Sequence, residues 1–526
     1  METYSDVEKH CSVILDEMTI GPSEEYIPQL DKFVGKVDMG GIVDPTDPNQ
    51  LATKMLGYIL VGLNTYYKIP VAYFLVYQLT AKQQEALTLQ VIKDVEGCGF
   101  KITRLVSDNL AVNTTMFKRM NDGDLFPVIR HPQQEYSEAD LLLKPWVYRP
   151  LFCSFDYCHV TKNVRNQLLE RNFHIKGERV TGDFAVRLFA EQTGELLTAV
   201  RSWTPKHVMP NNIEKQKVKA AMDMFRPAVT AAIEMHAALG TDGFVNVGST
   251  VRFMKRLHRW ISLHDVSSVK EQQRYRLPDK MPYYSPLDER LHFLESDFNP
   301  QLHEWHQEIE NLIKSMPDNN QSDKAAIKKT KKKFLTHETY EALTYTTTST
   351  VACIRYLLEE LDFKYVLTRR FSSDPVEQLF GAIRQLIGGN FKGDATAVSQ
   401  AFEKILRTGI AYNSIYGNTT LSRESEKEYK LIRYSEKSKI EMVKALRLLP
   451  PSSLLILNDL QKPPAKPKPT SQACTAALLS GYIIRVLLEQ EFCGDCVARL
   501  QDVKSTDPLM QLIFRLGCYL LSITKI

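Results

Sequence analysis

The sequence has no apolar run long enough to cross a membrane. Runs such as Met55–Leu63 and Val71–Leu79 are far shorter than the roughly 20 residues that a membrane helix requires. The N-terminus, Met1–His10, is acidic and polar and lacks the basic and apolar segments of a secretion signal. We therefore expect a soluble protein that stays inside the cell and has no membrane partner.

A regular cysteine pattern, a large net charge and a glycine-rich phosphate loop are also missing. The nine cysteines are an odd number scattered through 526 residues, which is typical of reduced thiols. Only Cys493 and Cys496 are closely spaced, and zinc would need further ligands such as Cys474 or Cys518, so we favour free thiols. The net charge of +4 leaves any nucleic-acid binding to local basic patches. No Walker-type loop supports a phosphate site.

The composition is that of an ordinary globular protein of three or four domains, with 44% hydrophobic and 24% charged residues. In the first 170 residues, β-rich runs alternate with helical windows, which predicts a mixed α/β sheet with covered faces. The expected strands are Cys11–Met18, Phe33–Met39, Pro70–Thr80, Lys101–Ser107 and Pro150–Phe155, and the expected helices are Ala81–Glu96, Ala111–Met120 and His159–Arg171.

From Gly177 to about Leu361 the strand signals fade and long helical windows follow. These windows are Ile213–Ala238, Thr250–Ser262, Asp288–Lys314 and Tyr340–Leu361. Pro317–Lys333 is polar and ends in a lysine run at 328–333, which we interpret as a solvated linker in preference to a phosphate-contacting arm. Two more helices are expected at Pro375–Ile387 and Ala397–Ala411.

Three carboxylates occupy positions from which a sheet could assemble a metal site. Asp16 follows apolar residues in an expected strand, where a buried charge needs a partner or a metal. Asp108 directly follows the strand 101–107, and Glu377 lies one turn into a helix. Two-metal phosphoryl transfer needs several converging carboxylates, because Mg²⁺ and Mn²⁺ prefer oxygen ligands. Taken singly, Asp108 could instead cap a helix, and Glu377 could be an ordinary first-turn glutamate.

Five sequence blocks add an ordered pattern to these acids. They are CSVILDEM (11–18), KVDMGG (36–41), RLVSDNLAVN (104–113), FDYCHVTKNVRN (155–166) and SSDPVEQLFGAIR (372–384). In this order they resemble the P-element transposase family, including its THAP-type relatives. The resemblance implies an α/β RNase H-like core of the retroviral-integrase type. It also implies that Asp16, Asp108 and Glu377 form the catalytic, metal-binding D-D-E set, with Mg²⁺ or Mn²⁺ as cofactor and double-stranded DNA as substrate.

The fourth block resembles the family's D-P-C-H-x-x-K-x-x-R-N segment. Asp156 and His159 match its first and fourth positions, and Tyr157 replaces the proline. We interpret Lys162 and Arg165 as structural or DNA-facing residues.

The family interrupts its RNase H fold before the last helix with a GTP-binding domain, and the block TPKHVMPNNIEKQKVKAAMDMF (204–225) looks like the start of that domain. The resemblance implies GTP as a ligand, contacted by Lys206, Lys217, Val218 and, returning from the core, Asp374. This sequence departs from the pattern farther on. Ser262 and Asp265 stand where the family has an Asp and an Asn, and Arg226 replaces a small hydroxyl residue.

The predicted domains follow from the interrupted core. They are the RNase H-like core in two parts (1–172 and 363–440), a mostly α-helical GTP-binding-type insertion domain (173–362), a Pro/Lys-rich tether (441–470) and a small helical C-terminal tail (471–526). The N-terminal zinc finger of the THAP-type relatives has no room before residue 11, so we expect this chain to lack it.

The resemblance implies cleavage and strand transfer of DNA by two-metal phosphoryl transfer, assisted by GTP. A domesticated, catalytically inactive DNA- or protein-binding factor is the main alternative. A nuclease of the exonuclease type is a third reading, with Asp156 as its fourth carboxylate. A nuclear location follows from the DNA substrate, for which the lysine run at 328–333 could be the import signal, and a homodimer is a further expectation.

Overall fold

The computed structural model describes residues 4–27, 31–134, 148–194, 198–272, 277–317, 321–389 and 393–415. The predicted tether and C-terminal tail lie outside the described residues, as do the cysteines at 474, 493, 496 and 518. No helix in the described ranges is both long and apolar enough to span a bilayer.

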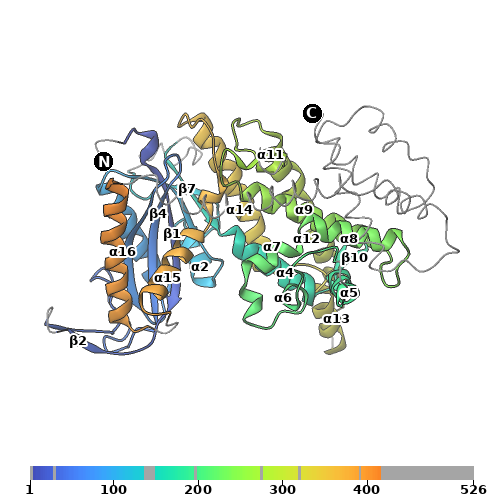
Figure 1. Ribbon diagram of the computed structural model, residues 1–526, viewed down its shortest axis with the longest axis horizontal. Coiled ribbons are helices and arrows are strands. Elements are labelled where there is room, and N and C mark those ends of the chain that lie inside the picture. Colours follow the sequence, from blue (N-terminus) through green and yellow to red (C-terminus); the bar gives the residue numbers. More distant parts are fainter. Residues whose placement is uncertain are drawn as a thin grey trace, which may run out of the picture. The chain divides into compact units, whose positions relative to one another are not determined.

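A six-stranded mixed sheet forms the core of the N-terminal part (Figure 1). Its strand order is β5-β4-β1-β6-β8-β7, and the strands are β1 (His10–Thr19), β4 (Lys54–Gly62), β5 (Lys68–Val76), β6 (Lys101–Ser107), β7 (Val128–Arg130) and β8 (Pro150–Phe155). Strand β1 pairs with β4 antiparallel and with β6 parallel, and the pair β6–β8 is also parallel. The predicted mixed α/β sheet is therefore confirmed.

Helices cover both faces of this sheet. They are α1 (Ala81–Gly97) and α2 (Ala111–Arg119) on one face, and α14 (His337–Glu359) and α15 (Asp374–Leu386) on the other. On the first face, the Tyr58 hydroxyl lies 3.0 Å from that of Thr88 on α1. On the second face, a Cβ at Gly57 would lie 2.9 Å from the Phe380 ring of α15. Only glycine at this strand position lets α15 pack so closely.

The second strand of the sheet is not the predicted one. We expected Phe33–Met39, but the sheet uses β4, which is buried along nearly its whole length. The predicted segment contributes only the short β3 (Lys32–Val34), which pairs with β2 (Glu25–Ile27), and two isolated bridges at Lys36 and Asp38. The reason is burial: a central strand covered on both faces is apolar throughout, whereas the alternation at 33–39 belongs to a partly exposed hairpin.

Between β8 and α15 the chain is mostly helical, as predicted. The elements are α4 (Tyr157–Glu170), β9 (Phe173–Ile175), β10 (Glu178–Val180), α5 (Asp183–Gln192), α6 (Pro205–Val208), η3 (Glu214–Gln216), α7 (Val218–Met224), α8 (Pro227–Ala238), α9 (Gly248–His264), η4 (Pro278–Lys280), α11 (Glu289–His292), the π-helical η5 (Phe293–Phe298), α12 (Asn299–Lys314), α13 (Gln321–Lys331) and η6 (Thr368–Phe371). The hairpin β9–β10 was not predicted, because strands of three residues carry no usable periodicity.

Two expected elements differ from the structure in this region. The window Ile213–Ala238 is divided into η3, α7 and α8, because Pro227 has no N–H for a continuous helix and begins α8 instead. The segment expected as a linker contains α13, and the lysine run begins in its last turn. Lysines there interact favourably with the carbonyl end of a helix.

The C-terminal helices return to the sheet. Helix α15 packs on β1 and β4, and in Figure 1 it lies in orange beside the blue strands, although more than 300 residues separate it from them along the chain. Helix α16 (Ala395–Ile415) follows, and its residue Phe402 packs against Tyr73 of β5, with ring centroids 4.8 Å apart. A segment that follows a long insertion thus completes the α/β core.

Candidate active site and nucleotide residues

The three predicted acids lie on one face of the sheet. Asp16 is on β1, opposite Gly57 of β4, and therefore shares the face on which α15 packs. Asp108 directly follows β6, the parallel neighbour of β1, and Glu377 is in the first turn of α15. The neighbouring acid Glu17 belongs to the opposite side of the strand, where it pairs with Lys54 at 2.7 Å.

Asp16 is the acid whose charge is most strongly affected by the site. Burial, together with the nearby negative charges of Asp108 and Glu377, raises the pKa of its carboxyl to about 7, against the opposing effect of His159. Asp108 and Glu377 are thus each close enough to Asp16 to disfavour its negative charge. A site that collects like charges on a half-buried face favours a bound cation.

Asp108 is held by its own helix. Its Oδ1 accepts hydrogen bonds from the side-chain amide of Asn113 at 2.6 Å and from the backbone N–H of Leu110 at 3.3 Å. Asn113 is in turn bonded to Gln84 of α1. Asp108 does not cap α2, whose N-cap residue is Leu110 and which has no side-chain cap. These contacts instead orient the carboxylate at the end of β6.

Glu377 has a histidine partner, His159, on α4 (Tyr157–Glu170). His159 Nε2 lies 3.0 Å from Glu377 Oε1, and the Glu377 side chain is 43% exposed. Hydrogen bonding to His159 lowers the pKa of Glu377. Burial opposes charge on the histidine, yet the bond to Glu377 and the charge of Asp156 raise the pKa of His159 overall. The pair with Glu377 therefore favours the protonated form of His159, and that form offsets part of the negative charge of the site.

Asp156 fixes the two helices that carry this pair. The side chain is fully buried at the N-terminus of α4, and its Oδ2 accepts the N–H of His159 at 3.0 Å. Its Oδ1 accepts the N–H of Ser373, the residue before α15, at 2.9 Å. Both carboxylate oxygens thus bind backbone, which argues against Asp156 as a fourth metal ligand and gives it a positioning role.

The donor chemistry of the site fits hard divalent cations. Carboxylate oxygens from β1, the end of β6 and α15 are the ligands that Mg²⁺ and Mn²⁺ prefer. In the conformation described, His159 holds Glu377, and no three acid, histidine or cysteine side chains among the described residues are close enough to hold one metal ion. Glu377 would have to exchange its histidine partner for a metal ion.

Asp16→Asn should stabilise the metal-free protein in a pH-dependent way. The pKa of this carboxyl is about 7 in the folded protein and 3.8 in the unfolded chain, so between these pH values the unfolded chain releases a proton that the folded protein keeps. The free energy of unfolding therefore falls as the pH rises from about 4 to about 7. Asparagine cannot ionise. The measurement is urea unfolding of both proteins in EDTA at pH 5 and pH 8. The variant should be more stable than wild type at pH 8, and this advantage should be about 1–2 kcal/mol larger than at pH 5, allowing for solvent screening.

Glu17→Gln is the matched control, because it changes the adjacent acid on the other face of β1. We expect it to leave this pH dependence as in wild type. If the free energy of unfolding depends on pH in the same way for Asp16→Asn and wild type, the pKa of Asp16 is not raised.

The predicted nucleotide residues fall into two groups. Lys206 is in α6, Lys217 directly precedes α7, and Val218 is the first residue of α7. The two short helices pack together, and His207 of α6 lies 3.6 Å from Asp223 of α7. Neither Lys206 nor Lys217 has a side-chain ion pair with another described residue, so both ammonium groups can receive a phosphate. Arg165 donates to the carbonyl of Lys206 at 3.2 Å and to those of residues 214 and 215, which makes Arg165 structural.

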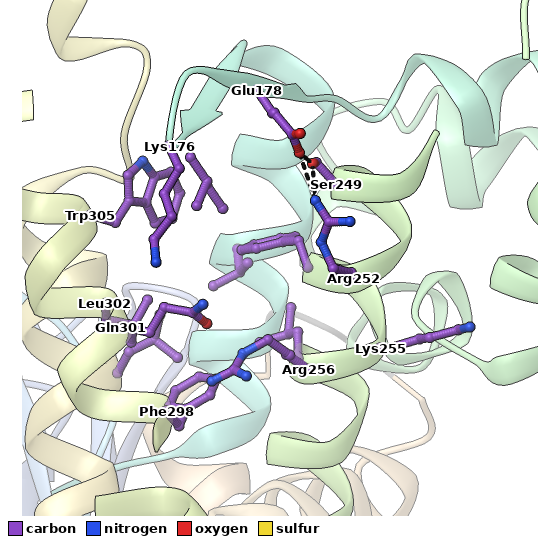
Figure 2. A pocket seen from close by; sticks show the side chains of 15 residues that line it. Lys176, Glu178, Ser249, Arg252, Lys255, Arg256, Phe298, Gln301, Leu302 and Trp305 are labelled. Carbon is purple, nitrogen blue, oxygen red and sulfur yellow. Dashed lines mark hydrogen bonds and ion pairs between the residues drawn. The ribbon is translucent and has the colours of Figure 1, made fainter. Parts of the chain in front are cut away.

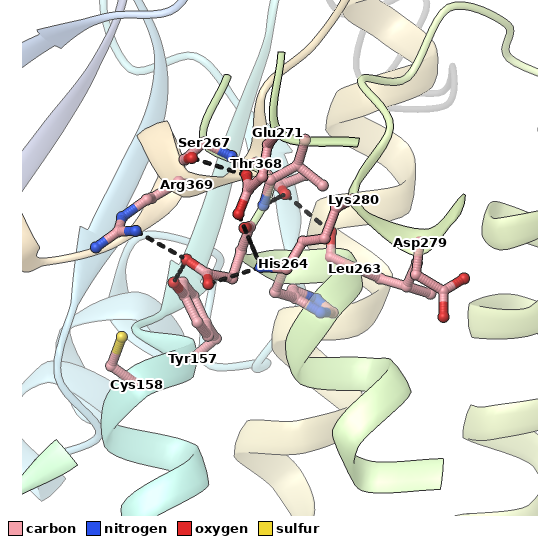
Figure 3. A network of polar contacts seen from close by, with 12 residues as sticks. Tyr157, Cys158, Leu263, His264, Ser267, Glu271, Asp279, Lys280, Thr368 and Arg369 are labelled. Atoms are coloured by element: carbon pink, nitrogen blue, oxygen red, sulfur yellow. Dashed lines mark hydrogen bonds and ion pairs between the residues drawn. The ribbon is translucent and has the colours of Figure 1, made fainter. Parts of the chain in front are cut away.

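Asp374 contacts Arg369, which belongs to a separate polar network. Figure 3 shows Arg369, Tyr157 and Lys280 of this network. Arg369 contacts Asp374 at 3.1 Å and Asp265 at 3.6 Å. Asp265 also accepts the Tyr157 hydroxyl at 2.7 Å and pairs with Lys280 at 2.8 Å. Among the described residues, no hydrogen bond or ion pair joins Asp374 to the lysines of α6 and α7.

Ser262 and Arg226, two of the residues that differ from the family pattern, each contact a neighbouring residue. Ser262 is buried, and its carbonyl accepts the N–H of Asp265 at 3.3 Å. Arg226 pairs with Asp223, 3.3 Å away. Arg369 and Lys280, which hold Asp265, were not singled out from the sequence, because their partners lie far away along the chain.

Two parts of the chain match family models, and its fold is similar to that of a solved structure. Residues 1–121 match the family model "TNP-like, RNase H N-terminal domain", and residues 158–276 match "TNP-like, GTP-binding insertion domain". The structure is similar to a solved structure described as "Drosophila P element transposase strand transfer complex", with a TM-score of 0.58 at 18% identity, over 77% of this chain and 79% of that chain. The RNase H-like fold with a helical insertion is thus confirmed.

Two transposases are similar to this chain in sequence. The chain is 23% identical over 386 residues to the Transposable element P transposase of Drosophila melanogaster. This aligned region covers 73% of this chain and 43% of that protein. It is 23% identical over 267 residues to the DNA transposase THAP9 of Homo sapiens, covering 49% and 28% respectively. The chain is therefore homologous to the P element transposases, and it spans less than half the length of these two relatives.

Proposed function

We propose that this chain is a transposase that cleaves DNA and transfers its strands with two divalent metal ions, Mg²⁺ or Mn²⁺, held by Asp16, Asp108 and Glu377. The observation that carries the proposal is the convergence of three acids on one face of the sheet, which contributes to raising the pKa of Asp16 to about 7. The homology to the P element transposases supports the same chemistry. A nuclear location follows from a DNA substrate.

In this proposal each residue has a defined task. The carboxylates of Asp16 and Asp108 approach from two adjacent parallel strands, so their spacing is set by the sheet. Glu377 comes from α15, which Asp156 holds at its first turn. When bound, the metal ions would activate a water molecule or the 3′-hydroxyl of a DNA strand as the nucleophile and would stabilise the charge on the phosphodiester. His159 would keep the Glu377 carboxylate oriented while Glu377 holds no metal ion.

The direct test is nicking and strand transfer on duplex DNA by the purified full chain. We expect products in Mg²⁺ or Mn²⁺ and none in EDTA, because the acids alone cannot activate a nucleophile. Mn²⁺ should also raise the melting temperature of wild type and not that of Asp16→Asn. DNA binding without cleavage under all metal conditions would instead indicate a domesticated binding factor.

We also propose that the insertion binds GTP, which then assists the DNA reaction. Lys206, Lys217 and Val218 would contact the nucleotide, and the ammonium groups of the two lysines suit its phosphates. Asp374 would contact the nucleotide only if its ion pair with Arg369 were replaced by a contact with the ligand. The match to the GTP-binding insertion domain supports this proposal.

Lys217→Ala should weaken GTP binding about tenfold, the loss of roughly one charge-assisted contact of 1.4 kcal/mol. Isothermal titration calorimetry would measure the dissociation constant. Lys219→Ala is the control, since this exposed lysine lies two residues farther along, in α7. Equal weakening by both variants would indicate a general charge effect and no contact at residue 217.

A further inference from the structure

The positive charge of this chain is concentrated in one short segment of the insertion. Residues 321–333 contain six lysines and one acid, Asp323, which gives the segment a formal net charge of +5. The whole chain has a net charge of +4, so all the other residues together carry a net charge of −1. A local charge of this size favours a strongly anionic partner.

Five of these lysines are exposed and have no carboxylate partner in the described part of the chain. They form what we call the lysine ridge, which consists of Lys324, Lys328, Lys329, Lys331 and Lys332. Lys324, Lys328 and Lys331 follow one another at spacings of four and three residues, which places them on one side of α13. The charges of the ridge are therefore not balanced by the described residues around it.

The cations around a nearby cavity of the insertion are balanced, by contrast. Figure 2 shows this cavity of about 480 Å³, which is lined by residues of α9 and α12 among others and carries four cations at its rim. Each of the four has an acid partner, and the pairs are Lys176–Glu304 (3.8 Å), Arg252–Glu178 (2.6 Å), Lys255–Glu234 (2.7 Å) and Arg256–Asp297 (3.0 Å). An anion would have to break an ion pair there, whereas the ridge offers five lysines without one.

The folded insertion holds the backbone of the ridge in place. Thr330 of α13 is buried between the exposed lysines on either side of it in sequence. The carbonyl of Lys331 accepts a hydrogen bond from the Arg171 guanidinium at 3.1 Å. The carbonyl of Lys333 accepts the N–H of His174 at 2.9 Å. The ridge, at the lower edge of the insertion in Figure 1, is thus a preorganised array of charges, which loses less entropy on binding than a disordered tail does.

The spacing and composition of the ridge fit the backbone of duplex DNA. At a rise of about 1.5 Å per residue, Lys324 and Lys331 are about 10 Å apart along the helix, and a duplex carries roughly six phosphate charges over that length. Helix α13 has no aromatic residue, and the next one, Phe334, is buried, so no ring of this segment is available for an unpaired base to stack on. Contacts from lysine to phosphate carry no sequence information.

We propose that the lysine ridge binds the phosphate backbone of duplex DNA without reading its sequence. The inference rests on the proposal that this chain acts on DNA, and it adds a DNA contact made by residues other than the three acids and the proposed GTP residues. Because the contact is one of charge, the affinity that it provides should fall steeply as salt is added.

The test is binding of a fluorescent DNA duplex to the full chain, measured by anisotropy in EDTA at several KCl concentrations. A variant with Lys324→Gln, Lys328→Gln and Lys331→Gln should bind at least tenfold more weakly at low salt. The slope of log K against log [KCl] should become shallower by about three, since each phosphate contact contributes roughly 0.9. The loss should be equal for two duplexes of unrelated sequence.

The matched control carries Lys82→Gln, Lys93→Gln and Lys364→Gln and loses the same net charge. These three lysines are also exposed and have no ion pair with another described residue, and two of them lie on α1, which covers the sheet face opposite the acids. The control should bind DNA nearly as wild type does. Lysine and glutamine have similar helix propensities, and thermal unfolding shows that each variant is folded. Arginine at the three ridge positions keeps the charge and should preserve binding.

Three results would overturn the proposal. The first is a ridge variant with the affinity and salt slope of wild type, which would leave the lysine run as a solvated surface or an import signal. The second is an equal loss in the control, because bulk charge then explains the effect, and the third is a wild-type chain that does not bind duplex DNA at low salt. Binding is measured without metal, whereas the proposed cleavage is tested with metal, so the failure of one can be told from the failure of the other.

Discussion

Glu377→Gln should reduce metal-dependent cleavage of DNA on the order of a thousandfold while leaving the fold intact. Glutamine has nearly the shape of glutamate but no charge, so the site loses one anionic metal ligand. A metal ion contributes several kcal/mol of transition-state stabilisation, and about 4 kcal/mol corresponds to a thousandfold in rate. The measurement is the single-turnover nicking rate in Mn²⁺ at pH 8.

The fold should tolerate this change because the Glu377 side chain is 43% exposed and its contact with His159 is near the surface. We expect a change in the free energy of unfolding below about 1 kcal/mol. Glu17→Gln serves again as the control, and it should cleave at nearly the wild-type rate. Cleavage by Glu377→Gln within about threefold of wild type would remove this residue from the catalytic set.

Trp260→Ala should lower the free energy of unfolding by about 3–5 kcal/mol, the usual loss for a large aromatic residue in a packed core. Trp260 is fully buried in α9, and its indole N–H donates to the Thr347 hydroxyl of α14 at 2.8 Å. Its ring also lies against Phe298, with centroids 6.0 Å apart. One side chain thus joins α9 to α14 and η5. Urea unfolding followed by circular dichroism measures the loss.

Two further variants show whether burial is the cause. Trp260→Phe keeps most of the ring volume but loses the hydrogen bond to Thr347, so its loss should be smaller than that of alanine, at about 1–2 kcal/mol. Leu287→Ala changes a side chain that is 87% exposed and should alter stability by less than about 0.5 kcal/mol. A loss below about 1 kcal/mol for Trp260→Ala would contradict the packing of α9 on α14 described above.

Much of the core was predictable because its signals are local. The strand at 101–107 and that at 150–155 match the observed β6 and β8, since each is a compact run bounded by clear breaks. Asp16 could be singled out because a charge interrupts an apolar strand, and the structure places it beside two other acids. The roles of Asp16, Asp108 and Glu377 in catalysis stay predictions.

What could not be predicted depends on contacts between distant residues. The bond from Ser373 to Asp156 joins residues 217 apart, and no local pattern indicates it. The same holds for the network of Asp265 with Lys280 and Arg369. The strand β4 was missed for a different reason, because a run that is apolar throughout has no periodicity by which a strand can be told from a helix.

The bond between Asp156 and Ser373 also concerns how the site forms during folding. Closing a flexible loop of this length costs roughly 5 kcal/mol of chain entropy. A prefolded insertion shortens the free segment between the two residues, so less entropy is lost when α15 docks on the sheet. The helices between β8 and α15 therefore serve the acid site as a compact spacer, and destabilising them should slow the docking of α15 even though none of the three acids lies within them.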